Sequence, residues 1–392
     1  MPQQPTIGYL VPQFPGQTHI FFWREIAALE QRGVKVRIFS TRRPPPGLIV
    51  HDWSAEAMAR TTYLGRIRPL AALAALPALP WGDMSGIARD IALSLSAARA
   101  LLLACRASGI SHIHVHSCGR SALIAALARR LGGPTYSLTL HGPLSDYGPG
   151  QRFKWRGAAF ATIITETLLA AVRDTLTGDL PDRLLVQSMG VDTASLRRDA
   201  AYVPPLPGAP LRLFSCGRLN IVKGHQDLLA AVRLLLDRGQ PVTLDIAGED
   251  NAGGKGYRQV LAAQITALQL TPHVRLLGAV DAGCVKAHLL AAHAFVLASW
   301  SEPLGVALME AMSCEVPTIG TAAGGVAELI TPGVDGLLVP PRDPGALADA
   351  IAAVAADPVG AKAMGLAGRT TVQRRFEATR GAETLIHLIG LR

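Results

Sequence analysis

The sequence predicts an α/β protein made of two Rossmann-like domains, each a doubly wound parallel sheet, that face one another across a cleft. Three observations support this fold class. The chain has 392 residues, more than one hydrophobic core usually organises. Strand-like and helix-like segments alternate in both halves, which is typical of parallel sheets. A proline-rich segment at 201–210 separates the halves and predicts a domain boundary.

The first half, residues 1–200, contains short apolar segments between amphipathic ones. Strands are predicted at 7–11, 34–40, 112–116, 135–140 and 162–165. Helices are predicted at 17–32 and 121–131, and Gly33 stands where a helix-ending glycine is favoured.

The second half repeats the scheme within residues 208–371. Strands are predicted at 211–216, 243–247, 274–277, 294–298, 317–320 and 336–339. A final helix at about 372–392 is expected to pack back on the first domain. Ligands of such sheets bind beyond the carboxyl ends of the strands, so the residues just after each strand are the candidates for chemistry.

The composition narrows the class of protein. Apolar residues make up 49% and charged residues 17%, as in a well-packed soluble protein, and the net charge of +9 favours anionic partners. Nucleic acid is disfavoured because the basic residues are scattered and aromatic residues are only 5%. The five cysteines form no C-x-x-C pair and the N-terminus lacks a signal-peptide pattern, so we expect a cytoplasmic protein.

A basic loop at 215–224 follows one predicted strand and precedes a helix that begins near His225. Its backbone N–H groups, the Arg218 guanidinium and the Lys223 ammonium would all reach one spot. A diphosphate requires such a site, because its charge is spread over several oxygens. The alternative is a solvated basic loop.

Two carboxylates lie in the segment 301–312. Pro303 can stand in the first turn of a helix, which would put Glu302 at the helix mouth and Glu310 about two turns inside. Ionised carboxylates accept hydrogen bonds from sugar and ribose hydroxyls. An acid that favours the helix dipole would explain Glu302 but not Glu310, which has apolar neighbours. Gly324 and Gly325, before the next helix, suggest a second anion-binding site, although paired glycines are weak evidence by themselves.

Histidines lie on one predicted strand of the first half and directly after another. His141 comes directly after the strand 135–140 and could polarise a reacting group near neutral pH, although an isolated histidine is more often packed or solvated. His112, His114 and His116 alternate on one strand face and could mimic a metal site, but we expect no metal.

These motifs carry a family resemblance. E-P-L-G-V-A-L-M-E-A-M, followed by V-P-T and G-G-V-A-E-L-I, resembles the E-x7-E signature of family 4 retaining glycosyltransferases. The segments G-R-L-N-x-x-K-G, L-D-I-A-G-E, V-R-L-L-G, T-L-H-G and Q-S-M-G-V-D, elsewhere in the chain, also fall in family order. The resemblance implies the GT-B fold, metal-independent chemistry, retention of the anomeric configuration, and a nucleotide diphosphate sugar as co-substrate with no cofactor.

The resemblance also implies roles for single residues. Arg218 and Lys223 would neutralise the diphosphate, Glu302 would contact the sugar, Glu310 the ribose, and His141 the sugar at the reaction centre. The implied catalytic set is His141, Lys223, Arg218 and Glu302. The implied donor-binding set is Gly16, Gly217, Arg218, Lys223, Gly248, Glu302, Leu304, Gly305, Glu310, Gly324 and Gly325.

Some positions depart from the family pattern. The loop at 12–19 lacks paired glycines and resembles the exopolysaccharide or colanic-acid subgroup. Glu315 stands where many relatives carry glycine, and Leu304 where phenylalanine is frequent. Donor affinity or specificity could therefore differ from that of the relatives.

The acceptor side is less defined. Thr18, His116, Asp146 and Arg152 are the expected acceptor contacts, and Lys154, Trp155 and Arg156 could add to them, with a solvated loop as the alternative. Arg60, Arg66 and Arg68 precede an apolar stretch at 69–81 that could rest on the inner face of the cytoplasmic membrane. Simple packing within the first domain is the alternative.

The function expected is transfer of a sugar from a nucleotide diphosphate donor to a saccharide or lipid-linked acceptor, in the synthesis of a surface polysaccharide or glycolipid. The domain at 1–200 would then bind the acceptor, and the domain at 208–371 the nucleotide sugar. A nucleotide-sugar epimerase, a phosphorylase or a non-catalytic binding module would share the fold. A dehydrogenase is disfavoured because no G-x-G-x-x-G follows the first strand of either half.

Overall fold

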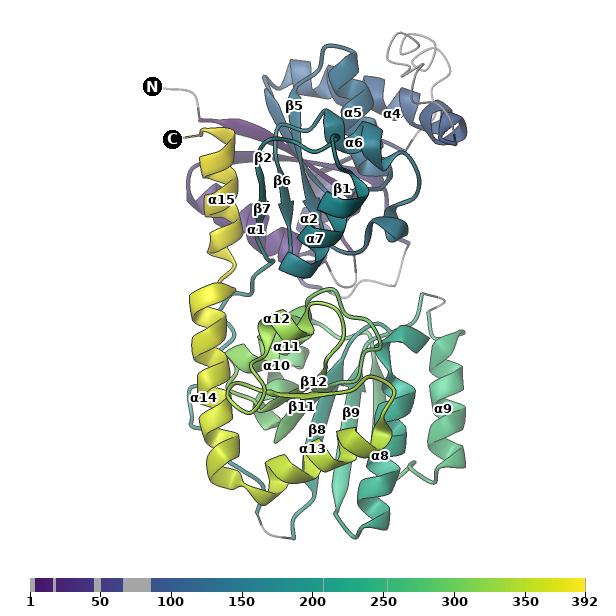
Figure 1. Cartoon of the computed structure of the whole chain (residues 1–392), viewed down its shortest axis with the longest axis vertical. Helices are drawn as coiled ribbons and strands as arrows, with labels where there is room; N and C mark the ends of the chain where they lie inside the picture. The colour runs from purple at the N-terminus through teal and green to yellow at the C-terminus, as the bar shows by residue number, and fades with distance from the viewer. Residues whose placement is uncertain are drawn as a thin grey trace. The chain divides into compact units, whose positions relative to one another are not determined.

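The computed structural model describes residues 4–16, 19–45, 51–65, 86–206, 208–251 and 253–391. These residues form two units (Figure 1). Unit 1 comprises the described residues within Met1–Pro46, Trp53–Ser188 and Thr379–Arg392. Unit 2 comprises those within Gly47–Asp52 and Met189–Ala378. Each unit is an α/β layer structure around its own parallel sheet, which confirms the predicted fold class.

Unit 1 is built on a seven-stranded parallel sheet of order β3-β2-β1-β4-β5-β6-β7. Its strands are β1 (Thr6–Gln13), β2 (Lys35–Arg42), β3 (Thr61–Tyr63), β4 (His112–His116), β5 (Thr135–Leu140), β6 (Ala161–Ile163) and β7 (Leu184–Val186). Its helices are α1 (Ile20–Gln31), α2 (Ser54–Arg60), α4 (Ala88–Ala107), α5 (Arg120–Arg130), the 3-10 helix η3 (Leu144–Tyr147), α6 (Gln151–Arg156), α7 (Glu166–Thr175) and α15 (Thr379–Ile389).

The two faces of this sheet are covered by different helices. On β1, Leu10 packs in one cluster with α4 and α5, whereas Tyr9 and Val11 pack in another with α1 and α15. The same alternation on β4 sends Ile113 and Val115 to the α4–α5 cluster. Because successive side chains of a strand point to opposite faces, the three histidines of β4 lie on the face that α1 covers.

Unit 2 is built on a six-stranded parallel sheet of order β10-β9-β8-β11-β12-β13. Its strands are β8 (Leu211–Cys216), β9 (Val242–Ala247), β10 (Val274–Gly278), β11 (Ala294–Leu297), β12 (Thr318–Thr321) and β13 (Leu337–Val339). Its helices are η4 (Ile221–Lys223), α8 (His225–Asp237), α9 (Tyr257–Ala267), α10 (Ala282–Ala291), α11 (Val306–Ser313), α12 (Val326–Leu329), α13 (Pro344–Ala356) and α14 (Pro358–Arg375).

Aspartate caps start three helices of unit 2. Asp281, Asp343 and Asp357 each accept a hydrogen bond from a backbone N–H in the first turn of α10, α13 and α14. Pro344 and Pro358 follow two of these caps and occupy the first helical position, where no N–H is required. The Asp-Pro pairs therefore fix where α13 and α14 begin.

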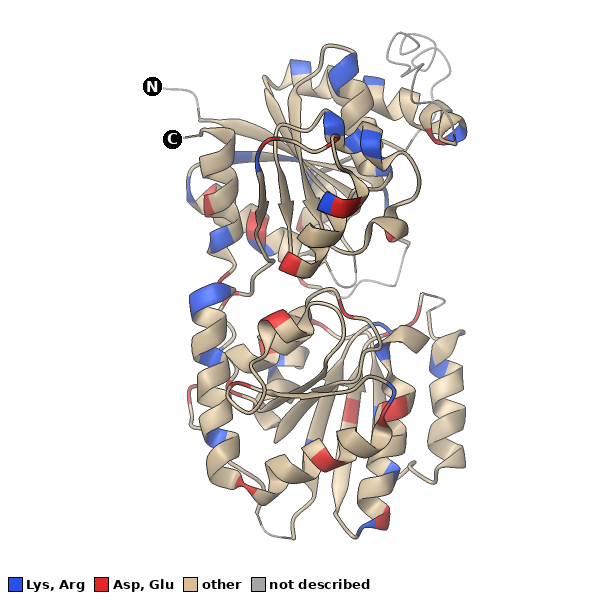
Figure 2. Ribbon diagram, viewed as in Figure 1, with Lys and Arg blue, Asp and Glu red and all other residues tan. Residues whose placement is uncertain are grey.

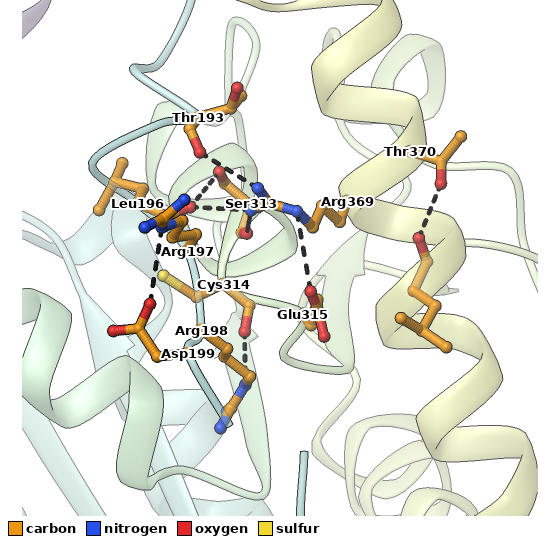
Figure 3. Close-up of polar contacts among 11 residues, drawn as sticks. Thr193, Leu196, Arg197, Arg198, Asp199, Ser313, Cys314, Glu315, Arg369 and Thr370 are labelled. Carbon is orange, nitrogen blue, oxygen red and sulfur yellow. Dashed lines mark hydrogen bonds and ion pairs between the residues drawn. The ribbon is translucent and has the colours of Figure 1, made fainter. Parts of the chain in front are cut away.

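The boundary between the units differs from the predicted one. The sequence put it in the proline-rich segment at 201–210, but unit 2 already begins at Met189. The backbone of Val191 pairs with Glu377, and the Arg198 guanidinium donates to the carbonyls of Cys314 and Leu290, at 2.6 and 3.0 Å. Figure 3 shows the contact between Arg198 and Cys314. Arg369 of α14 also donates to backbone carbonyls of this segment. These bonds tie residues 189–200 to unit 2.

The C-terminal helix belongs to unit 1. Ala382 and Leu385 of α15 are buried in the cluster that contains Phe22 and Ile26 of α1, and Arg32 forms an ion pair with Glu383 at 2.6 Å. Helix α14 ends at Arg375 within unit 2, and the chain enters unit 1 again at Thr379. The expected helix at 372–392 is thus two elements, with a break between them.

Lys and Arg are spread over helices of both units, including α5, α6 and α14 (Figure 2). In the described parts of the chain, no single helix has the length and hydropathy to cross a bilayer, and α13 with α14 reaches that hydropathy only as a pair bent by 104°. Arg66, Arg68 and the apolar stretch at 69–81 lie outside the described residues, so the expectation of a membrane contact there stays a prediction.

Candidate functional site

The charged candidates of unit 2 meet where its strand order reverses, between β8 and β11. Lys223 lies in η4 after β8, and Glu302 lies in the loop after β11. The Lys223 ammonium forms an ion pair with the Glu302 carboxylate. The reversal point of a parallel sheet leaves a crevice at the carboxyl ends of the strands, and such crevices bind ligands in this class of fold. The structure therefore brings Lys223 and Glu302 together at the expected edge.

Glu302 is held on more than one side. Its side chain is nearly buried, and the Ser299 hydroxyl donates to the same oxygen that Lys223 contacts, at 3.1 Å. A buried carboxylate is costly unless it is paired and hydrogen-bonded. Ser299 and Lys223 supply both kinds of partner. Sequence reasoning missed Ser299, although its place directly after a strand was a usable signal.

Glycines allow the loops around this pair to approach closely. Gly224 has a φ of 66°, and a Cβ there would lie 1.8 Å from the carbonyl oxygen of Ala298. Gly248 has a φ of 137°, and a Cβ there would lie 1.9 Å from the carbonyl oxygen of Gly217. Both positions exclude a side chain by conformation and by space. The loops after β8, β9 and β11 are thereby packed backbone to backbone.

Glu310 lies on α11 and acts on Cys216 at the end of β8. Burial raises the pKa of the Cys216 thiol to about 12, and the charge of Glu310 adds to that increase while Lys223 opposes it. Glu310 and Lys223 therefore act in opposite directions on the charge of the same strand end. The helix position differs from the prediction: α11 begins at Val306 after Gly305, whose φ is 96°, so Pro303 precedes the helix and Glu310 is little more than one turn inside.

Gly324 and Gly325, which were expected to bind an anion, instead pack against the backbone of Glu302. Gly324 has a φ of 64°, and a Cβ there would lie 2.3 Å from the carbonyl oxygen of Glu302. The Gly325 N–H donates to that same oxygen at 2.9 Å. Its donor capacity is thus used within the protein, contrary to the role of phosphate donor expected for Gly325. α12, which follows, spans only Val326–Leu329.

Arg218 and His225 complete this edge of unit 2. The Arg218 side chain is exposed, as a group that binds an arriving anion requires. His225 opens α8 and is buried; burial, with Lys223 nearby, lowers its pKa to about 4, which keeps the ring neutral. Leu304 was expected to contact the donor, but its side chain is buried, so it packs in the interior instead.

The histidine candidates of unit 1 form a connected cluster. His116 Nδ1 lies 2.9 Å from His141 Nε2, and His116 Nε2 lies 2.9 Å from Glu25 Oε2 of α1. Tyr9 donates its hydroxyl to that Glu25 oxygen at 2.6 Å. Burial lowers the pKa of His116 to about 3 and that of His141 well below its usual value, so both rings are neutral. The residue that sequence reasoning missed here is Glu25.

The other two histidines of β4 are satisfied by hydroxyl groups. His112 contacts Thr135 and Ser137, each at 2.8 Å. His114 contacts Ser137 at 2.8 Å and Thr139 at 2.9 Å. Among the described residues, Glu25, His114 and His116 each have one potential metal-ligand atom within 4.8 Å of the others. Hydrogen bonds already engage both His114 nitrogens, whereas His116 Nε2 is buried and forms no hydrogen bond with the described residues. That the protein works without a metal stays a prediction.

The comparisons with known proteins match this architecture unit by unit. Residues 19–197 match the glycosyl transferase 4-like domain, and residues 201–371 match the glycosyl transferases of group 1. The chain is a glycosyltransferase. The two matches together span both sheets, and the second includes the Lys223–Glu302 pair.

Individual relatives agree with this assignment. The glycosyltransferase is 26% identical to the putative colanic acid biosynthesis glycosyltransferase WcaL of Salmonella typhimurium, over 88% of this chain and 89% of that protein. Sucrose-phosphate synthase from Thermosynechococcus elongatus superposes with a TM-score of 0.76 at 22% identity, covering 99% of this chain and 100% of that one. Anabaena HepE in complex with UDP-glucose superposes with a TM-score of 0.78 at 16% identity, with the same coverage of both chains. These structures show a shared GT-B fold.

The remaining candidates of the glycosyltransferase lie in both units. Gly16 follows β1, and a Cβ there would lie 2.1 Å from the His19 ring. Gly217 donates its N–H to the carbonyl of Ala247 at 3.0 Å. Asp146 is exposed in η3. Thr18 lies outside the described residues.

The cationic residues after His141 differ from the expectation of an acceptor surface. Arg152 and Arg156 both pair with Asp179, at 2.7 and 2.6 Å, and lower its pKa. Lys154 is buried, and burial lowers its pKa to about 8. Trp155 is fully buried. Lys154 and Trp155 therefore support the packing of α6 on the sheet, and Arg152 is engaged within the protein.

Proposed function

We propose that this glycosyltransferase moves a sugar, with retention of its anomeric configuration and without a metal ion, from a nucleotide diphosphate donor to a saccharide or lipid-linked acceptor. The observation that carries the proposal is the Lys223–Glu302 pair at the strand reversal of unit 2. Arg218 is exposed in the segment between β8 and η4, and the charge of Glu310 acts on Cys216 at the end of β8. Cations and hydroxyl acceptors stand together there, as a nucleotide sugar requires.

The donor would use the existing charges without rearranging them. The Lys223 ammonium has three donor protons, so it can keep Glu302 and also contact a phosphate oxygen. Arg218 adds a planar guanidinium that suits two phosphate oxygens at once. Fixed cations stabilise the charge that develops on the departing diphosphate, which supports chemistry without a metal.

The carboxylates would select the sugar and the ribose. Glu302, oriented by Ser299, is a pure acceptor for a sugar hydroxyl, and Glu310 is the corresponding acceptor for the ribose. His141 acts at the reacting sugar, where a neutral imidazole can exchange hydrogen bonds without bringing a charge. Anabaena HepE, which shares the fold, was solved in complex with UDP-glucose, and this supports a nucleotide sugar as donor.

We further propose that the product is part of a surface polysaccharide or glycolipid, made at the cytoplasmic face of the membrane. The Salmonella typhimurium relative is a putative colanic acid biosynthesis glycosyltransferase, which supports the product class. The net charge of +9 and the five cysteines, all free, support contact with an anionic surface in a reducing compartment.

A transfer assay tests the proposal. The protein is incubated with UDP-, GDP-, ADP- and dTDP-glucose, a set of saccharide and lipid-linked acceptors, and EDTA. We expect release of nucleoside diphosphate and a product whose anomeric coupling, read by NMR, matches that of the donor. An inverted product would contradict retention. Activity that appears only when Mg²⁺ replaces EDTA would contradict the metal-independent mechanism.

A further inference from the structure

Glu25 stands in the middle of a chain of polar atoms that ends at His141. Tyr9 donates its hydroxyl to Glu25 Oε2, which lies 2.9 Å from His116 Nε2. His116 Nδ1 lies 2.9 Å from His141 Nε2. The four residues come from β1, α1, β4 and the loop after β5, so the contacts run from the middle of β1 to the carboxyl ends of β4 and β5. The T-L-H-G motif around His141 gives no indication of these contacts.

We propose that Glu25 is a positioning residue that, through His116, fixes His141 in the tautomer with its proton on Nε2. The His141 Nδ1 atom is then the ring nitrogen that accepts hydrogen bonds. The inference rests on the proposed function for the role of His141 in sugar transfer. It adds Glu25 and His116 as the groups that determine which ring nitrogen of His141 donates a proton and which one accepts.

The Glu25 carboxylate determines which atom is the donor in each of these contacts. A carboxylate can only accept, and an imidazole lone pair 2.9 Å from it would be repelled, so His116 Nε2 carries the proton although its N–H is not aimed directly at Glu25. A neutral His116 then has a bare Nδ1, which requires the proton of the 2.9 Å contact to come from His141 Nε2. The second nitrogen of a neutral imidazole carries the lone pair.

The surroundings keep the chain in this state. Burial lowers the pKa of His116 to about 3, and burial together with the Glu25 charge raises the pKa of Tyr9 well above its usual value. His116 is therefore neutral and Tyr9 remains a donor. The Phe22 ring lies 4.7 Å from the His116 ring and 5.6 Å from the His141 ring, measured between centroids, and limits their rotation.

Helix α15 packs closely against the Glu25 carboxylate at Gly381. A Cβ at Gly381 would lie 2.6 Å from Glu25 Oε1. The chain that returns from unit 2 thus passes directly over the carboxylate, and only glycine leaves that oxygen in place. Gly381 therefore offers a way to move Glu25 without replacing any member of the chain.

Tautomer measurements on selectively ¹⁵N-histidine-labelled full-length protein test the proposal. In the wild type we expect both His116 and His141 to carry the proton on Nε2. Glu25→Gln keeps the size of the side chain but offers N–H donors to His116, so the His141 tautomer should shift toward Nδ1–H. Gly381→Ala should cause a smaller shift in the same direction. His112→Asn is the matched control, because His112 is buried on the same strand and its ring nitrogens contact Thr135 and Ser137.

Kinetics separate positioning from general damage to the fold. Glu25→Gln should lower kcat at least about tenfold, part of the factor that general acid–base catalysis usually supplies, with the donor KM little changed. His112→Asn should lower the melting temperature and leave the His141 tautomer and kcat as in the wild type. A His141 ring with its proton on Nδ1 in the wild type, or no response to Glu25→Gln, would overturn the proposal.

Two further outcomes are distinct. If the wild type shows the expected tautomers but transfers no sugar, the proposed function is contradicted while the assigned hydrogen-bond direction stands, because the spectra do not depend on turnover. If stoichiometric zinc binds and removes the His116 ring-proton signal, the cluster is a metal site and the proposal is overturned.

Discussion

The two polar centres of this protein, one in each unit, are built on opposite principles. In unit 2 the centre is a charged pair, Lys223 with Glu302, and the loops around it are fixed by glycine backbone contacts. In unit 1 the centre consists of two neutral imidazoles, His116 and His141, whose ring nitrogens lie 2.9 Å apart, with the Glu25 carboxylate 2.9 Å from His116. The first suits an anionic ligand, because its cations are already in place. The second suits directional hydrogen bonding, because burial removes charge and leaves proton positions to be set by partners.

The largest effect is expected at the charged centre. Lys223→Ala removes a cation that faces the developing diphosphate charge and leaves Glu302 without its ion pair. We expect turnover to fall by about 10²–10³-fold, the size seen when one charge-stabilising donor is lost. Steady-state kinetics measure this change. Arg238→Ala is the matched control, since Arg238 pairs with Asp349 on the exposed surface of the same unit, and it should keep wild-type turnover. Near-normal activity of the Lys223 variant would refute the phosphate assignment.

A smaller effect is expected where glycine fixes the loops of the charged centre. Gly248→Ala would place a Cβ 1.9 Å from the carbonyl oxygen of Gly217 at a φ of 137°, so we expect a loss of at least about 2 kcal/mol in the free energy of unfolding. Gly239→Ala also has a positive φ, of 78°, but nothing within 4 Å, and should cost about 1 kcal/mol. Urea unfolding compares the two. Equal costs would show that the close approach is relaxed easily.

The smallest effect concerns the response of the neutral centre to a modest change of pH. Burial lowers the pKa of His116 to about 3, below the ordinary value of about 6.5 that it regains on unfolding. The unfolded state therefore binds the proton first. Stability due to this group is complete above pH 6.5 and is lost as the pH falls toward 3, by up to about 1.4 kcal/mol per pH unit.

Urea unfolding at pH 7, 6 and 5 tests this slope. His116→Asn should flatten it, while His387→Asn, at an exposed position of α15, should leave it as in the wild type. A slope that is the same in the wild type and in His116→Asn would mean that His116 is not held neutral in the folded protein.

The sequence predicted the fold and the charged centre well because both depend on local patterns. Strands at 112–116, 135–140 and 211–216 agree with β4, β5 and β8 to the residue. Apolar periodicity and the position of a motif after a strand are visible along the chain. Arg218, Lys223 and Glu302 could be found in this way, because strand ends of one parallel sheet meet at one edge. Glu310 lies inside α11 and was found from its spacing to Glu302.

The parts that the sequence did not predict depend on contacts between distant residues. Glu25 is one acid on an amphipathic helix, and nothing near it in the chain indicates that it lies against His116. Pro303 looked like a helix start, but the left-handed Gly305 begins α11 instead. Trp155 looked like a surface ligand, but its burial is decided by packing on the sheet.

Calorimetric titration with UDP-, GDP-, ADP- and dTDP-sugars tests the central claim, that unit 2 holds a nucleotide-sugar site at the Lys223–Glu302 edge, most directly. We expect one nucleotide sugar to bind at micromolar affinity, Arg218→Ala to lose that binding, and Glu25→Gln to keep it, because Glu25 belongs to the neutral centre of unit 1. Absence of binding by every nucleotide sugar, or wild-type affinity in Arg218→Ala, would contradict the account.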